Sequence, residues 1–336
     1  MNLDYLRPVA EHLWQSTLFA GIAGLLTLTL RRNRARLRHW LWLAVSCKFL
    51  IPLSVLTALG AQLAWWTPSP REQSSFSIVM EEVGQTLAPP AISAALLPSQ
   101  APAARTLYPA VLLIIWTCGF TGIALCWWIR WRGILAAVRS GSPVELGIPI
   151  PARSSPTLLE PGIFGVYRPV LLLPEGIFDR LSPTQLQAVI AHELCHLRYR
   201  DNLTAAIQMF IETVFWFYPL VWWIGKRIVA EREHDCDEEV LRLGIQPQVY
   251  AEGILNVCKF YLESPLACVS GITGSNLKAR IRKIMNYQAT NNLDWGRKTL
   301  LSAVGIAAAA GPITFGFTCA SCGKKSKAIL NAHTTY

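Results

Sequence analysis

The chain contains uncharged, apolar stretches that are long enough to cross a lipid bilayer. Residues 106–129 form an uncharged run of 24 residues, and residues 13–30 form one of 18. The backbone of a spanning segment has no water to bond to inside the bilayer, so such a segment must be helical. Residues 40–66 are a weaker candidate, interrupted by a lysine and a proline, and residues 299–323 are another, rich in alanine. We therefore predict a mainly α-helical membrane protein with four transmembrane helices.

The positions of the basic residues predict which side of the membrane each segment faces. Only 15% of the 336 residues are charged, against about 25% in a typical soluble domain, and the net charge is +10. Lysine and arginine are concentrated in cytoplasmic segments. The loop after the first run contains five arginines and no acid, and basic residues flank residues 131–298 at both ends. We therefore place that region in the cytoplasm and attribute the positive charge to topology, not to direct nucleic-acid binding.

The predicted organisation has six segments. They are two transmembrane helices with a basic cytoplasmic loop (1–66), an extracytoplasmic loop (67–105), a third transmembrane helix (106–130), a cytoplasmic domain (131–298), a fourth transmembrane helix (299–323) and a short extracytoplasmic tail (324–336). The nine cysteines are scattered and odd in number, which indicates a reducing compartment and no disulfide framework. No cleavable signal peptide is evident before the first run.

The cytoplasmic segment contains the pattern H-E-x-x-H at residues 192–196. Ser182, Pro183 and Gln185 are residue types typical of the N-cap, N1 and N3 positions of a helix. Histidines four residues apart lie on one face of a helix, so His192 and His196 can bind one zinc ion. Glu193 lies beside the first histidine, where its carboxylate can take a proton from the attacking water.

A catalytic zinc ion needs a third protein ligand and one open position. No third histidine follows closely, but Glu233 and Asp237 lie four residues apart in an acidic stretch. One carboxylate could bind the metal while the other orients a ligand histidine. A solvated acidic helix face is the alternative, and spacing alone leaves both open. Asp201 could brace the active-site helix or cap it, while Cys195 and Cys236 are interpreted as small buried side chains.

Residues 203–229, between the histidines and Glu233, are apolar enough to suggest another span. Such a span would place Glu233 on the other side of the membrane from the histidines. Pro219 ends an aromatic run at residues 215–218 and breaks the segment, so that each half is too short to cross. We predict a helical hairpin whose aromatic tip lies on or dips into the membrane and whose second arm returns Glu233 to the metal.

A set of short motifs extends from the third apolar run to the fourth. It comprises residues 162–165, 168–169, 173–174, 186–201, 215–223, 233–237, 268–271 and 277. Together these motifs resemble the bacterial β-lactam-sensor antirepressor metallopeptidases of the BlaR/MecR family. The resemblance implies a gluzincin-like α+β zinc peptidase domain at residues 131–298, one Zn²⁺ per chain and Glu233 as third ligand. It also implies that a strand near residues 170–173 receives a substrate chain by β-addition.

The resemblance further implies a function, with one departure. Antibiotic-sensing family members carry an outer penicillin-binding domain after the fourth span, whereas here only residues 324–336 follow it, so direct β-lactam acylation is not expected. We expect a multi-pass protein of the bacterial cytoplasmic membrane that cleaves itself, between residues 262 and 277, or a winged-helix transcriptional repressor. A homodimer is one possible assembly.

Two other functions compete with this reading. One is a membrane quality-control metalloprotease of the HtpX type, and the other is a non-catalytic signalling scaffold with a vestigial site. Within the proposed peptidase site, Asp237 and Asp201 are predicted to contact the metal ligands without binding the metal themselves. Tyr199, Arg200 and Tyr250 are candidates for stabilising the oxyanion, with no sequence feature to choose among them.

Overall fold

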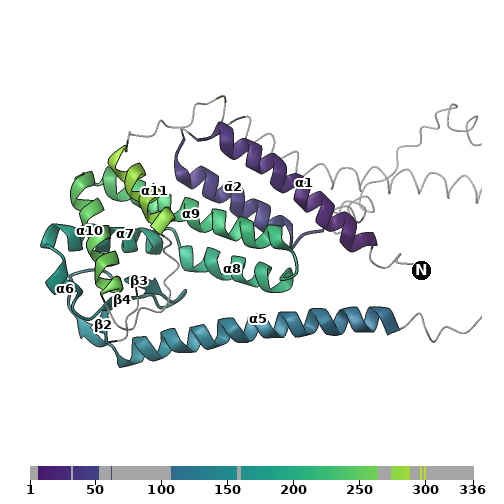
Figure 1. Ribbon diagram of the computed structural model, residues 1–336, viewed down its shortest axis with the longest axis horizontal. Coiled ribbons are helices and arrows are strands. Elements are labelled where there is room, and N and C mark those ends of the chain that lie inside the picture. Colours follow the sequence, from purple (N-terminus) through teal and green to yellow (C-terminus); the bar gives the residue numbers. More distant parts are fainter. Residues whose placement is uncertain are drawn as a thin grey trace, which may run out of the picture. The chain divides into compact units, whose positions relative to one another are not determined.

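The computed structural model describes residues 7–31, 33–52, 107–156, 160–263 and 274–287, together with residues 62, 296 and 299 (Figure 1). The chain divides into two units, one formed by Met1–Leu50 with Thr117–Lys298 and the other by Ile51–Trp116 with Thr299–Tyr336. The described helices are α1 (Arg7–Thr29), α2 (Ala35–Lys48), α5 (Leu107–Ser140), α6 (Ile177–Arg180), α7 (Pro183–Arg198), α8 (Asp201–Val214), α9 (Pro219–Arg242), α10 (Pro247–Leu262) and α11 (Gly274–Met285). The strands are β1 (Ser142–Val144), β2 (Ala152–Ser155), β3 (Gly162–Phe164) and β4 (Val170–Pro174).

Within the described residues, one helix is long and apolar enough to cross a membrane. It covers Tyr108–Ser140 of α5, and its 18-residue apolar window has a mean hydropathy of 2.0 and no buried residue. The helix continues beyond residue 130, the predicted end of the third span. The predicted fourth helix, apart from residue 299, and the two extracytoplasmic segments lie outside the described residues, as does most of the predicted self-cleavage segment.

The predicted second span differs from the structure where it is described. We expected one helix over residues 40–66, but α2 begins at Ala35 and ends at Lys48, and residues 49–52 are not helical. Pro52 explains the break, because it has no N–H to donate to the carbonyl of Lys48 and its ring clashes with that carbonyl. The described part of this span is therefore not one continuous helix.

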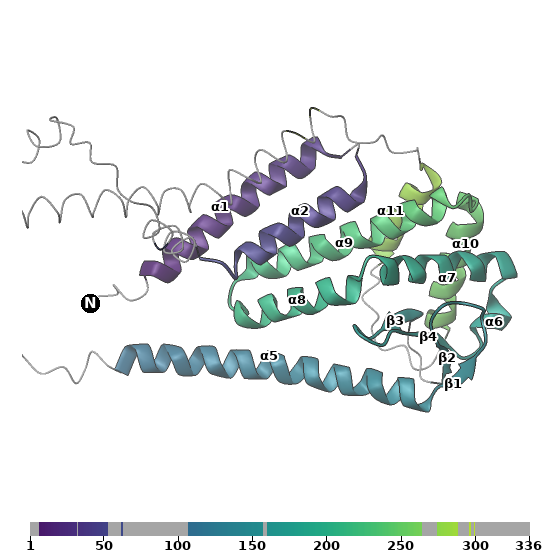
Figure 2. The same ribbon diagram turned by 180° about the vertical axis from the view of Figure 1, so that it is seen from behind.

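Helices α1, α2, α9 and α8 lie side by side in that order (Figures 1 and 2). The contact between α2 and α9 is the most extensive between any two of the described helices. The shared core consists of Ala20, Ala23, Trp42, Leu43, Val45, Phe49, Ile211, Val221, Ile224 and Ile228. Arg38, which the sequence placed in the basic loop, is buried and pairs with Glu231 of α9 at 2.8 Å. The helix that carries Glu233 is therefore held directly by α2.

The structure contains the helical hairpin predicted between the histidines and Glu233, while the membrane contact predicted for its tip stays a prediction. Helix α8 ends at Val214, the chain turns over residues 215–218, and α9 begins with Pro219 at its first helical position. The tip packs against other helices: the ring of Phe215 lies 5.6 Å from that of Phe49, and the Tyr218 hydroxyl lies 2.5 Å from Thr17 Oγ1. The tip thus packs against α1 and Phe49, while Phe217 remains 43% exposed.

A third helix, α5, reaches the same tip through a glycine. A Cβ atom placed on Gly119 would overlap the indole ring of Trp216, whereas one on Gly122 would meet nothing within 4 Å. The absence of a side chain at Gly119 therefore allows the closest approach between α5 and the hairpin.

Gly119→Leu should destabilise the protein, because the added side chain must displace Trp216, and overpacking of this kind costs about 1–3 kcal/mol. Gly122→Leu, on the same helix, should leave stability nearly unchanged. Thermal unfolding of the purified protein in detergent measures both. In a Trp216→Ala background the cost of Gly119→Leu should disappear; an undiminished cost would show that Trp216 is not the obstacle.

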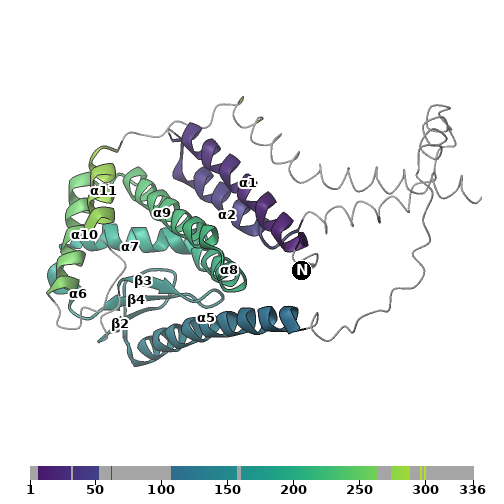
Figure 3. The same ribbon diagram turned by 45° about the vertical axis from the view of Figure 1, so that its right-hand side comes forward.

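The four described strands form one sheet in the order β1-β2-β4-β3, close to α7 (Figure 3). Strand β4 is parallel to β2 and antiparallel to β3, so both of its edges are paired. The prediction that residues 170–173 receive a substrate strand is therefore wrong. The run of buried leucines in β4 is typical of an internal strand, because such a strand is covered on both faces. The edges among the described strands are β1 and β3.

Candidate metal centre

Helix α7 begins as its sequence predicts. The Ser182 side chain accepts a hydrogen bond from the Gln185 backbone N–H, and the Gln185 side chain accepts one from the Ser182 N–H, which completes a capping box with Pro183 at N1. Val189 packs against the sheet and Ala188 against the core formed with α10. These contacts fix the rotation of α7 about its axis and direct its histidines toward α9.

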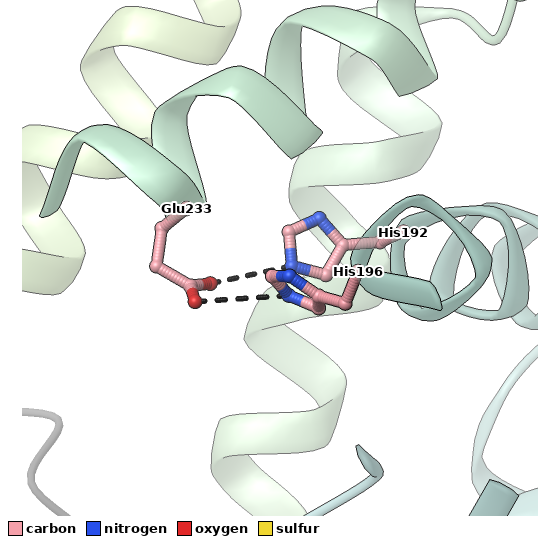
Figure 4. Close-up of side chains that lie close together, drawn as sticks. All are labelled: His192, His196 and Glu233. Carbon is pink, nitrogen blue, oxygen red and sulfur yellow. Dashed lines mark hydrogen bonds and ion pairs between the residues drawn. The ribbon is translucent and has the colours of Figure 1, made fainter. Parts of the chain in front are cut away.

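The structure brings the three predicted ligands together (Figure 4). His192 Nε2 lies 3.3 Å from Glu233 Oε2, and His196 Nε2 lies 3.7 Å from Glu233 Oε1. One ligand atom from each residue lies within 4.8 Å of the others. Two imidazole nitrogens and one carboxylate oxygen form the donor set of many catalytic zinc sites, so these residues fit a zinc ion with a position left for water.

Asp201 contacts the far side of His196. The α7–α8 turn depends on Arg200, whose φ of 55° is a left-handed conformation that few non-glycine residues adopt. This tight turn places Asp201 Oδ2 2.7 Å from His196 Nδ1. Burial alone would lower the pKa of His196, but the hydrogen bond to Asp201 and the nearby Glu233 outweigh it and raise that pKa. With its proton on Nδ1, His196 presents the Nε2 lone pair to the centre.

His192 is oriented through a relay. Its Nδ1 lies 2.9 Å from the Tyr250 hydroxyl, which donates to Asp237 Oδ1 at 2.6 Å. The direct distance from His192 Nδ1 to that carboxylate is 3.4 Å, so Tyr250 carries the connection. Tyr250 is buried, and its hydroxyl is already used by His192 and Asp237. This arrangement argues against Tyr250 as the group that stabilises an oxyanion.

The remaining oxyanion candidates, Tyr199 and Arg200, have other contacts or backbone roles in the structure. The guanidinium carbon of Arg36 lies 4.0 Å from the centroid of the Tyr199 ring, and Tyr199 and Asp201 both line a small cavity. Arg200 makes the turn described above. Cys195 and Cys236 are both buried, as predicted, and Cys236 Sγ lies 3.3 Å from His196 Nδ1.

The two glutamates of the site differ in their electrostatic environment. Burial raises the pKa of Glu193, against the opposing effect of His192 and His196, which suits a carboxylate that must accept a proton. Burial would also raise the pKa of Glu233, but the hydrogen bond with His192 and the charge of His196 hold it well below its usual range. Glu233 therefore stays ionised, as a metal ligand must.

Two residues of the centre carried no sequence signal. Arg232 donates to Glu233 Oε1 at 3.2 Å from the neighbouring position on α9. Arg280, on α11, contacts Asp237, Tyr250, His192 and Glu233. Arg280 lies 30 residues along the chain from Tyr250, the nearest of these, and neither arginine belongs to a spacing pattern. Only the packing of α11 against α9 and α10 brings Arg280 to the site.

Asp201→Asn should weaken zinc binding about 10- to 100-fold, since loss of a carboxylate that orients a ligand histidine typically has this effect. The amide keeps the shape but can present its N–H₂ to Nδ1, which favours the wrong tautomer. Asp179→Asn, on the short helix α6 before the active-site helix, is the control. Zinc dissociation constants from chelator competition measure both variants, and equal affinity in the Asp201 variant and the wild type would contradict the assignment.

Comparisons with known proteins identify the family of the chain and several relatives. The family model described as BlaR1 peptidase M56 matches residues 11–284. The regulatory protein BlaR1 of Bacillus licheniformis is 32% identical over 145 residues, which cover 41% of this chain and 24% of that protein. The methicillin resistance mecR1 protein of Staphylococcus aureus (strain Mu50) is 24% identical over 135 residues, 38% of this chain and 23% of that protein. Protease HtpX homolog 2 of Methanosarcina acetivorans is 42% identical over 48 residues, 14% of this chain and 16% of that protein.

Proposed function

The chain belongs to the BlaR1 peptidase M56 family, and on that premise we propose that it is an integral membrane zinc metalloendopeptidase. The observation that carries the proposal is the convergence of three side chains: His192 and His196 from α7 and Glu233 from α9. Helix α8 separates these two helices in the sequence. Asp201 and Tyr250 fix the outer nitrogens of both imidazoles, which is the support that metal ligands require.

The chemistry follows from the roles of the surrounding side chains. A bound zinc ion would supply a Lewis acid that lowers the pKa of water and polarises the scissile carbonyl. Glu193 accepts the proton of the attacking water and then donates it to the amine of the leaving peptide. The carboxylate of Glu193 is buried, and the raised pKa that burial causes keeps it a useful acid after it has been a base.

We place the site on the cytoplasmic side, in a chain with four transmembrane helices, of which α5 is the third. The distribution of arginine and lysine in the sequence supports this orientation. The packing of α8 and α9 against α1 and α2 supports a peptidase domain built partly from membrane-embedded helices. A gluzincin-like domain agrees with a small sheet, the H-E-x-x-H helix beside it and a glutamate from a later helix.

The proposed substrate is a protein: the chain itself or a winged-helix transcriptional repressor in the cytoplasm. Relatives named as a regulatory protein and as a methicillin resistance protein support a signalling role. The chain covers about a quarter of their length, so the trigger that they sense is not transferred to it.

A test compares two substrates at equal concentration. The purified full chain in detergent, loaded with zinc, is incubated with a repressor encoded beside its gene and with an unfolded membrane protein of unrelated sequence. Cleavage of the repressor at one site, with the unrelated protein intact, is the expected result. Cleavage of both would favour a quality-control protease like the HtpX homologues. A result in which the repressor, the unrelated protein and the chain itself all stay intact would contradict a peptidase role.

A further inference from the structure

Arg280 of α11 enters the proposed metal centre from a helix outside the ligand motifs. Its Nη2 and Nε donate to the two oxygens of Asp237, at 2.7 and 2.9 Å. Its Nη2 also lies 3.4 Å from the Tyr250 hydroxyl and 3.2 Å from His192 Nε2, and its Nη1 lies 3.6 Å from Glu233 Oε2. The shortest contacts are thus the two-pronged pair with Asp237, the geometry in which arginine binds a carboxylate most strongly.

Asp237 needs this partner because its side chain is only 4% exposed. A buried carboxylate is costly unless it is paired and hydrogen-bonded. The other donor to Asp237 Oδ1 is the Tyr250 hydroxyl, so removal of the guanidinium would leave a buried anion with one hydrogen bond. The carboxylate would then rotate or take up a proton, and in either case the Tyr250 hydroxyl would lose its fixed acceptor.

The consequence reaches His192. The Tyr250 hydroxyl accepts a hydrogen bond from His192 Nδ1–H while it donates its own proton in a hydrogen bond to Asp237. Arg280 therefore acts on the imidazole through two successive hydrogen bonds. Its longer contacts, to His192 Nε2 and Glu233, involve acceptors that a metal ion would take, and the arginine can lose them while the pair with Asp237 persists.

The packing of α11 against its core also places Arg280 beside Asp237, so the two occur together. Ile284 is 1% exposed in the core shared with α7, α9 and α10, and Leu277 and Ile281 pack against the same core. These three side chains and Arg280 recur every three or four residues, so they lie on one face of the helix. A displacement of α11 from this core therefore withdraws the guanidinium from Asp237.

We propose that Arg280 is a positioning residue that makes the zinc affinity of the centre depend on the docking of α11. The inference rests on the proposed function and adds a means of regulating it.

The test measures zinc affinity of the full chain in detergent by competition with a chromogenic chelator. Arg280→Ala should weaken binding about 10- to 100-fold, the range for groups that orient a metal ligand. Arg280→Lys, which keeps the charge but loses the two-pronged geometry, should recover part of the affinity. Ile284→Ala should also weaken binding, because it loosens α11. Arg282→Ala, exposed on the same helix, is the matched control and should bind as the wild type does.

A double-mutant cycle with Asp237→Asn separates this role from general damage to the fold. If Arg280 acts through Asp237, the two substitutions together should weaken binding little more than Asp237→Asn alone. Additive losses, an Arg280→Ala affinity equal to that of the control, or tighter binding in Arg280→Ala would each overturn the inference while the wild type still binds zinc. A wild type that binds no zinc would overturn the proposed function and the inference together.

Discussion

Glu193→Gln should remove peptidase activity and leave zinc binding intact. The glutamine has the size of the glutamate but cannot accept a proton from water, and a positioned general base contributes about 100- to 10,000-fold to rate. Glu193 is buried and lies between the two histidines in the sequence, and among the described residues it forms no hydrogen bond with His192, His196 or Glu233. The substitution should therefore lower the rate of peptide cleavage without lowering the affinity for zinc.

Cleavage of the repressor, or of the chain itself, is followed by gel analysis and mass spectrometry of fragments. Zinc content is measured on the same samples. Glu252→Gln, an exposed glutamate on α10, is the control and should cleave normally. Identical fragments from the Glu193 variant at the wild-type rate would show that the observed cleavage comes from another protease or another site.

The local part of the site could be predicted because it is encoded within one helix. The Ser182 cap and the four-residue spacing of the histidines are short-range features, and the structure reproduces both. The hairpin was also predictable, since Pro219 interrupts the apolar run whatever surrounds it. These features depend on backbone geometry over a few residues, which sequence specifies directly.

The rest depends on contacts between distant segments. Asp237 was expected to orient a histidine, but the intervening Tyr250 comes from another helix, and Arg280 comes from a third. The apolar run in β4 predicted a strand correctly, but its two pairing partners, β2 and β3, could not be predicted because they come from other segments of the chain. The pairing partners of strands and the hydrogen-bond relays between side chains depend on packing between distant segments. No residue spacing in the sequence predicts that packing.

Glu233→Gln should weaken zinc binding by more than the roughly 10- to 100-fold expected for residues that only orient a ligand. The amide is neutral, so the ion loses its one anionic protein ligand, while His192 and His196 alone leave two of four positions to water. A ligand that binds the folded state raises the unfolding temperature, so the thermal shift produced by zinc should vanish in this variant. Differential scanning fluorimetry with and without zinc measures that shift.

The comparison with Asp237→Asn makes this prediction discriminating, because spacing alone left either carboxylate as the third ligand. Glu233 lies within 3.7 Å of both histidine Nε2 atoms, whereas Asp237 faces the outer nitrogen of His192 and is held there by Arg280. Glu233→Gln should therefore be the more damaging of the two. Glu239→Gln, six positions along α9 and paired with the arginines at 198 and 242, should keep the zinc-induced shift. A larger loss in the Asp237 variant than in the Glu233 variant would exchange their roles and move the metal to the other side of His192.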